Sequence, residues 1–260
     1  MNEVNNTLYI PLYGKALVSR RGIILRDPKA EEIWEKEGFP LKGKSKSKWL
    51  ALYMAMRSAV FDRWLERQMA AEPDAVILHI GCGMDSRILR VGNREHLWYD
   101  VDFPDVIEQR KRHYGPIDGY TMLASDARDP AWLAAVPADR TAIVVLEGIS
   151  MYMNPQELTA VLARLKQHFD KVCLLMDCYT SVAAKASKYR NPINDVGVTT
   201  VYGLDDPRIL EASGLIFLEE HSLTPDSMID ELRGMEKWLF RKLYAGSIAR
   251  AMYRLYEFRG

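Results

Sequence analysis

The sequence predicts a doubly wound α/β protein built on a mostly parallel sheet. Short apolar runs typical of buried strands alternate with helical segments from Val76 onward. The first run ends in a glycine-rich turn, Gly81–Gly83, and the second ends in Asp102, which lies 21 residues after Gly81. Nucleotide-binding α/β folds place an acid about 20 residues past the glycine turn, where it binds ribose hydroxyls. The chain has 260 residues, enough for one domain with a large core.

The first 72 residues are predicted to form a helical segment, most regular over residues 27–71. Apolar side chains recur there at the spacing of one helix face. Such a stripe is the surface that a helix packs on a core, and we assign it no other role. It consists of Trp49, Leu50, Tyr53, Met54, Met56, Val60, Phe61, Trp64 and Leu65.

Seven strands are predicted after this segment, separated by helices that would cover both faces of the sheet. The helix Asn154–Phe169 has a recognisable start, because Asn154 can cap it, Pro155 suits its first position and Glu157 follows three residues after the cap. The predicted strands are Val76–Ile80, Leu97–Val101, Tyr120–Leu123, Ala142–Leu146, Val172–Met176, Leu215–Glu219 and Tyr253–Phe258.

One segment, Tyr179–Arg208, interrupts the alternation of strands and helices. It is polar, carries several tyrosines and is longer than a plain connection. An insertion at the strand ends of an α/β sheet lies over the ligand crevice, so we predict a lid or substrate-binding cap. The alternative is a peripheral helix without a role. The single domain thus comprises a cofactor-binding core (73–178), this insertion (179–208) and a C-terminal part of the core (209–260).

Composition excludes several kinds of partner. With 35 basic and 35 acidic residues the net charge is zero, which offers no general field for nucleic acid or an anionic membrane surface. No apolar run approaches the roughly 20 residues of a membrane span. Three cysteines without a C-x-x-C pair predict a reduced, cytoplasmic protein. The five histidines show no ligand spacing, so no metal site is expected. The oligomeric state is left open.

The turn after the first strand favours a cofactor without phosphate. A dinucleotide site has a third glycine that packs helix against strand, and residues 81–86 lack it. Asp85 stands in the turn instead, where we expect it to repel a diphosphate, and no P-loop motif occurs. S-adenosylmethionine, an adenosine compound without phosphate, suits such a turn. The alternative is an ordinary strand–helix turn followed by an ordinary acidic strand end.

Six short motifs follow one another in a fixed order: Tyr9–Ala16, Arg26–Ala30, Gly81–Arg87, Tyr99–Pro104, Ser125–Asp129 and Leu146–Met153. Together they resemble the leucine carboxyl methyltransferase family, in particular its bacterial branch of polyketide O-methyltransferases. The resemblance runs from about Thr7 to the C-terminus and departs at Ser86, where threonine is usual, and at Ala127, where leucine is usual. It implies a seven-stranded class I methyltransferase (Rossmann-like) sheet.

The resemblance adds cofactor contacts to Asp102, whose carboxylate can accept both ribose hydroxyl hydrogens. Asp126 is implied to accept the adenine amino hydrogen, with the backbone of Ala127 beside it. The glycine turn contributes Gly81, Cys82, Gly83 and Asp85.

At the amino-acid end of the cofactor, the resemblance implies three further contacts. Glu147 is placed at the methionine ammonium. Arg57 is placed at the carboxylate, where Lys15 assists it. Each of these residues also has a plain interpretation as a member of an ion pair.

Methyl transfer from a sulfonium needs mainly correct positioning of the two reactants. Tyr152, five residues past Glu147, is our candidate for the residue that faces the reacting methyl group. The acceptor pocket would have aromatic walls, although core packing explains any single tyrosine equally well. Arg190, and more weakly Arg21, could bind a substrate carboxylate. The candidate wall residues are Tyr13, Tyr179, Tyr189 and Tyr202.

These observations favour an S-adenosylmethionine-dependent O-methyltransferase that acts on a carboxylate or hydroxyl of a small, polyketide-like molecule. A carboxylate is ionised at pH 7 and needs no general base, whereas a phenol usually needs one. The alternatives are methylation of a peptide or protein C-terminus and a module that binds the cofactor without catalysis.

Overall fold

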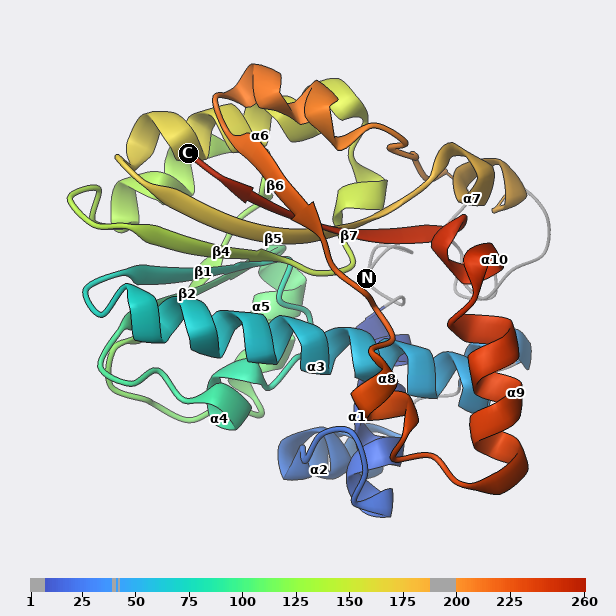
Figure 1. Ribbon diagram of the computed structural model, residues 1–260. Helices are drawn as coiled ribbons and strands as arrows, with labels where there is room; N and C mark the ends of the chain where they lie inside the picture. Colours follow the sequence, from blue (N-terminus) through green and yellow to red (C-terminus); the bar gives the residue numbers. More distant parts are fainter. Residues whose placement is uncertain (1–7, 39–40, 42, 188–199) are drawn as a thin grey trace.

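The fold is described from a computed structural model, which covers residues 8–38, 41, 43–187 and 200–260. Its centre is a seven-stranded sheet in the order β3-β2-β1-β4-β5-β7-β6 (Figure 1). The pairs among β1 to β5 are parallel, and β7 runs antiparallel to both β5 and β6. This confirms the predicted mostly parallel α/β sheet. The strands are β1 (Val76–Ile80), β2 (Leu97–Asp102), β3 (Tyr120–Ala124), β4 (Ala142–Leu146), β5 (Val172–Tyr179), β6 (Ile216–Glu220) and β7 (Tyr253–Arg259).

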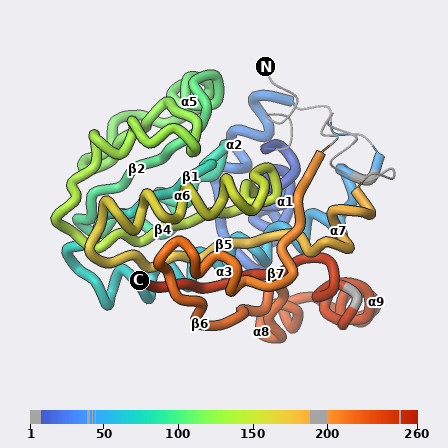
Figure 2. Tube along the Cα trace, turned by 90° about the horizontal axis from the view of Figure 1, so that it is seen from above, coloured from blue at the N-terminus to red at the C-terminus, as the bar shows by residue number. Residues whose placement is uncertain are grey.

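Helices cover both faces of the sheet, as the strand pattern predicts. On one face α3 packs against β4 and β5, with α1 against α3 and α2 against α1 (Figure 1). On the other face lies α6 (Figure 2), which contacts η3 and η6. The helices are α1 (Tyr9–Arg21), α2 (Pro28–Glu37), η2 (Gly43–Lys46), α3 (Lys48–Ala71), α4 (Arg87–Val91), α5 (Pro104–Lys111), η3 (Pro130–Ala135), η4 (Ser150–Tyr152), α6 (Pro155–His168), α7 (Ser181–Ala186), η6 (Pro207–Ser213), α8 (Asp226–Ile229), α9 (Gly234–Tyr244) and α10 (Ser247–Arg250).

Two hydrophobic cores follow from the alternation of side chains along each strand. Ile77 and Val145 belong to the core under α3, whereas Leu78 and Val144 belong to the core under α6. The predicted stripe on α3 is buried along most of its length, because this helix is covered by the sheet, by α1 and by the C-terminal helices. Residues 51–61 of α3 are all buried, and a buried segment can carry polar groups only where they find partners. Arg57 and Ser58 lie in this segment.

Local sequence signals set the ends of α6. The predicted capping box is present: Asn154 accepts from the Glu157 backbone amide at 2.9 Å, and the Glu157 carboxylate accepts from the Asn154 amide at 2.9 Å. Pro155 occupies the first turn, where no amide hydrogen is needed. The helix therefore begins where the sequence predicts.

Strand β5 is longer than predicted, and the reason is tertiary. Its last three residues, Asp177 to Tyr179, pair with Leu255, Arg254 and Tyr253 of β7. This partner strand lies more than 70 residues away in sequence, as the residue numbers show, so no local signal marks the extension. The extra length carries Asp177 and Tyr179 toward the carboxyl ends of the neighbouring parallel strands.

The predicted insertion after β5 is described only in part. Tyr179 ends β5, Thr180 caps α7, and Gly203 forms a bridge with Tyr179. Positions 188–199 lie outside the described residues. In the part of the chain that the structure describes, no helix is both long and apolar enough to cross a bilayer.

Candidate cofactor and acceptor site

A cavity of about 650 Å³ opens at the carboxyl ends of β1, β2 and β4. This is the place where parallel α/β sheets bind their ligands. It is lined by the glycine turn, by acids at the ends of β2, β3 and β4, and by several tyrosines. Twelve of the residues singled out from the sequence line it: Lys15, Arg57, Gly81, Cys82, Gly83, Asp85, Asp102, Asp126, Ala127, Glu147, Tyr152 and Tyr179.

The turn after β1 brings backbone close to this cavity because two positions are glycine. Gly81 and Gly83 have φ values of 70° and 51°, which favour glycine. A Cβ on Gly81 would lie 2.1 Å from the Cγ2 atom of Ile149. A side chain at this position would therefore displace the loop after β4, so the motif glycine is required by packing as well as by conformation.

Asp102, the last residue of β2, is held by backbone amides. Its Oδ2 accepts from Gly83 N–H at 2.7 Å, and its Oδ1 accepts from Phe103 N–H at 2.8 Å. Burial raises the pKa of Asp102 to about 6, and these two amide hydrogen bonds only partly oppose the shift. The carboxylate is thus a desolvated acceptor to which further hydrogen-bond donors would be favourable.

Glu147, directly after β4, is held by side chains from two helices. Its Oε1 accepts from Arg57 Nε at 3.0 Å and from Ser58 Oγ at 2.7 Å, and its Oε2 pairs with Arg87. Burial alone would raise the pKa of Glu147, but the Arg87 and Arg57 guanidinium groups outweigh it and lower the pKa to about 2. The group is therefore ionised at any physiological pH.

Asp85 is also compensated by cations, which corrects one step of the sequence argument. Its Oδ2 lies 3.0 Å from Lys15 Nζ and its Oδ1 lies 2.8 Å from Arg90 Nη1. These cations, with Arg87 nearby, hold the pKa of Asp85 well below its usual range despite burial. A carboxylate that is paired on both oxygens has little charge left to repel a diphosphate. The expectation against dinucleotides thus depends on the missing third glycine and not on Asp85.

The cavity is flanked by a buried ionic array with one more carboxylate than cation. Four cationic side chains take part, and five carboxylates face them, within the part of the chain that the structure describes. Sequence reasoning missed most of this array, although Arg87 stands inside the motif Gly81–Arg87. The cations are Lys15, Arg57, Arg87 and Arg90, and the carboxylates are Asp27, Asp62, Asp85, Glu147 and Asp177.

The part of the cavity beside Asp126, where the resemblance implies the adenine, is more open. Asp126 follows β3 and pairs with Arg128, whose Nη2 lies 2.6 Å from its Oδ2. Hydrogen bonding to Arg128 lowers the pKa of Asp126. Both side chains are partly exposed, so this pair is an ordinary surface ion pair beside the cavity.

Only some of the tyrosines predicted to face the acceptor lie at the cavity. Tyr152 and Tyr179 line the cavity. Tyr13 does not join them, because its ring packs on Trp34 with 5.0 Å between centroids. Tyr202 is 40% exposed and is not among the lining residues.

Of the two predicted arginine clamps, the structure describes only Arg21, which does not line the cavity. Arg21 lies at the surface and pairs with Glu236 of α9 at 2.6 Å, which explains it without a substrate. Tyr189 and Arg190 lie outside the described residues. The rest of the cavity is lined by apolar and aromatic side chains: Leu50, Tyr53, Met54, Met151, Leu243, Tyr244 and Met252. Leu50, Tyr53 and Met54 belong to the stripe that the sequence predicts to pack on the core, and they line the cavity as well.

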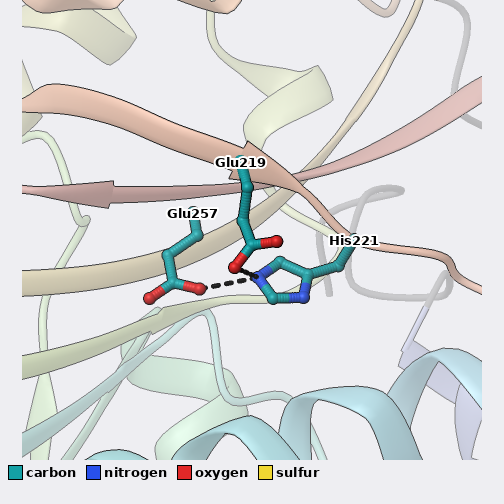
Figure 3. Close-up of side chains that lie close together, drawn as sticks. All are labelled: Glu219, His221 and Glu257. Carbon is teal, nitrogen blue, oxygen red and sulfur yellow. Dashed lines mark hydrogen bonds and ion pairs between the residues drawn. The ribbon is translucent and has the colours of Figure 1, made fainter.

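A second polar cluster lies on the neighbouring strands β6 and β7 (Figure 3). Glu219 and Glu257 stand opposite each other in the antiparallel ladder, and His221 Nε2 lies 2.6 Å from Glu257 and 4.0 Å from Glu219. The three side chains are close enough to share a cation. Histidine spacing along the chain could not indicate this group, because Glu257 comes from another strand. A hydrogen bond between His221 Nε2 and the Glu257 carboxylate accounts for the arrangement.

The residues around the main cavity fit S-adenosylmethionine. The glycine turn leaves room for backbone to approach a ligand, and Asp102 offers an under-solvated acceptor for hydroxyl groups.

Comparison with known proteins agrees with this assignment. The model of the leucine carboxyl methyltransferase family matches residues 3–166. The tetracenomycin polyketide synthesis O-methyltransferase TcmP of Streptomyces glaucescens is 32% identical over 92% of this chain and 90% of its own length. Two solved structures share the fold at 13% sequence identity. One is a putative methyltransferase from Thermobifida fusca YX, with a TM-score of 0.58 over 89% of this chain and 86% of that protein. The other is the magnesium protoporphyrin IX methyltransferase ChlM of Synechocystis PCC 6803, with a TM-score of 0.51 over 90% of this chain and 99% of that protein. The chain therefore belongs to the leucine carboxyl methyltransferase family and is an S-adenosylmethionine-dependent methyltransferase.

Proposed function

We propose that the chain transfers a methyl group to an oxygen of a small, largely apolar molecule of polyketide-like character. The observation that carries this proposal is the composition of the acceptor half of the cavity, where Tyr53, Met54, Tyr179 and Tyr244 are exposed to the space. Aromatic walls with polar tips suit a flat, amphipathic acceptor. The relative TcmP, named for polyketide synthesis, supports the same acceptor class.

The methyl donor supplies an activated sulfonium, so the work of the chain is to bind and orient. Asp102 would hold the ribose and Asp126, with Ala127, the adenine. Glu147, Arg57 and Lys15 would hold the amino-acid part, and Tyr152 would stand beside the reacting groups. Holding two reactants in line can contribute several kcal/mol toward the barrier, roughly 7–11 in the best intramolecular cases.

A carboxylate is the acceptor that we favour, because it needs no proton removed. The titratable groups around the amino-acid end are engaged: Glu147 pairs with two arginines, Asp85 with Lys15 and Arg90, and His79 Nε2 lies 2.9 Å from Arg87. A group that already holds an ion pair is a poor general base. A hydroxyl acceptor is the competing case, and it would require a base to deprotonate it.

Alkali distinguishes the two acceptors without knowledge of the substrate. The chain is incubated with S-adenosylmethionine labelled on the methyl group and with candidate extracts, and the labelled product is then treated with mild base. A methyl ester releases its label, whereas a methyl ether keeps it. Stable label would rule out the ester, and no labelled product from any extract would favour a module that binds without catalysis.

The segment 179–208 is proposed to select the acceptor rather than to bind the donor. Tyr179, Ala183 and Ser187 at its start line the cavity on the acceptor side. Exchange of this segment with that of a relative should change the acceptor, while the dissociation constant of S-adenosylhomocysteine stays within about threefold. Loss of S-adenosylhomocysteine binding in a folded exchange variant would contradict this division.

A further inference from the structure

Arg57 is held at one edge by a pair of residues that the sequence did not indicate. Its Nη1 donates to the Tyr253 hydroxyl oxygen at 2.7 Å and lies 3.0 Å from Asp177 Oδ2. Tyr253 begins β7 and Asp177 lies within β5, so these partners come from two strands adjacent in the sheet. All three side chains are buried, and Asp177 has no exposed surface.

The directions of these hydrogen bonds are fixed by the chemistry of the groups. The Tyr253 hydroxyl has one hydrogen and donates it to Asp177 Oδ2 at 2.6 Å, so only its lone pairs remain to face Arg57. Asp177 Oδ1 accepts from the Gly148 backbone amide at 2.7 Å. Asp177 thus ties together Tyr253, Arg57 and the loop that follows β4.

The other two nitrogens of the Arg57 guanidinium, Nε and Nη2, form no hydrogen bond with Tyr253 or Asp177. Nε donates to Glu147 Oε1 at 3.0 Å. Among the described residues no hydrogen bond engages Nη2, which lies beside Gly148, itself a lining residue of the cavity. A Cβ on Gly148 would lie 3.3 Å from Nη2, so the glycine leaves this edge uncovered.

We propose that Tyr253 and Asp177 are positioning residues, which fix Nη1 of Arg57 so that Nη2 is presented to the carboxylate of the methyl donor. This inference rests on the proposed placement of the donor. A free arginine side chain has several rotatable bonds, and holding it in its binding geometry beforehand saves the entropy of ordering it when the ligand binds. Tyr253 also touches the cavity, whereas Asp177 does not and acts through Tyr253, Arg57 and Gly148.

The test compares two ligands that differ only at the end in question. S-adenosylhomocysteine has the amino-acid part, and 5′-methylthioadenosine has the same nucleoside without it. Calorimetry of the full chain with Tyr253→Phe should show S-adenosylhomocysteine binding weakened about tenfold, as for a lost hydrogen bond to a charged group, and 5′-methylthioadenosine binding unchanged. Tyr256→Phe is the matched control, because Tyr256 is a buried tyrosine of the same strand that packs in the opposite core. It should change neither affinity.

Two further variants keep the inference testable. Asp177→Asn retains an acceptor for Gly148 but loses the charge, and it should repeat the selective loss. Arg57→Lys removes the clamped atom, so adding Tyr253→Phe to it should cost nothing more.

Equal weakening of both ligands by Tyr253→Phe would show a merely structural role and overturn the inference, as would no change in either. If the wild-type chain bound S-adenosylhomocysteine no more tightly than 5′-methylthioadenosine, the proposed placement of the amino-acid part would itself fail.

Discussion

At the proposed nucleoside end of the cavity Asp102 is held by two backbone amides, whereas at the proposed amino-acid end Glu147 is held by side chains of α3 and α4. The consequences for charge are opposite. Burial dominates at Asp102 and raises its pKa to about 6, while arginines outweigh burial at Glu147 and lower its pKa to about 2. The Asp102 carboxylate can therefore accept further hydrogen bonds that a ligand would donate. The Glu147 carboxylate, by contrast, is paired with arginines before any ligand binds.

The largest expected effect concerns stability. Glu147→Gln keeps the size of the side chain but leaves Arg57 and Arg87 without their shared carboxylate, so it should lower the free energy of unfolding by about 3–5 kcal/mol. Asp102→Asn is the matched change at the other end, and it should cost less than about 1 kcal/mol or stabilise, because burial disfavours the charge that it removes. Denaturant titration measures both. If both variants lost the same free energy of unfolding, the proposed difference between the two ends would be wrong.

The next effect concerns affinity at the nucleoside end. Asp102→Ala leaves the ribose hydroxyls without their acceptor and should weaken S-adenosylhomocysteine binding by about 1–3 kcal/mol. The fold should survive, since Asp102 lies at a strand end and not in the core. Calorimetry gives the affinity and circular dichroism the fold. Normal binding by this variant would mean that Asp102 is not the ribose ligand.

A pH dependence of binding should follow from the raised pKa of Asp102. The hydroxyl groups require the carboxylate form, so affinity for S-adenosylhomocysteine should be constant above pH 7 and fall as the pH drops through about 6, by about tenfold at pH 5. Glu147, with its pKa near 2, stays ionised over this range. The Asp102→Asn variant should bind more weakly with a flat profile, and a sloping profile in that variant would assign the titration to another group.

The smallest effect is expected at the exposed adenine end. Arg128→Ala removes the partner of Asp126, and a surface ion pair of this kind contributes about 0–1 kcal/mol to stability. The affinity for S-adenosylhomocysteine should be unchanged or slightly higher, because the Asp126 carboxylate is released. A stability loss as large as that of Glu147→Gln would contradict the ranking of the two ends.

The same comparison explains what the sequence could predict. The residues of the proposed nucleoside end lie close together in the sequence. The spacing of a glycine turn and a later acid follows from strand–turn–helix geometry, so the sequence predicts both. The strands and the capped start of α6 are likewise local, because apolar alternation and capping residues act over a few positions.

The amino-acid end depends on contacts that no local pattern encodes. Asp177 and Tyr253 meet because β7 inserts between β5 and β6, and Tyr253 then reaches Arg57 of α3. Tyr13 and Tyr202 were candidates by residue type alone, and burial against Trp34 and exposure to solvent place them elsewhere. Residue type predicts what a side chain can bind, and only the tertiary fold decides what it faces.

The most direct test of the account is a crystal structure of the full chain with S-adenosylhomocysteine. The account predicts the ribose hydroxyls within about 3 Å of the Asp102 carboxylate, and the ligand carboxylate at the Nη2 edge of Arg57 with Nη1 still on Tyr253. A ligand that bound elsewhere, or that reached the cavity with its ribose away from Asp102, would contradict it.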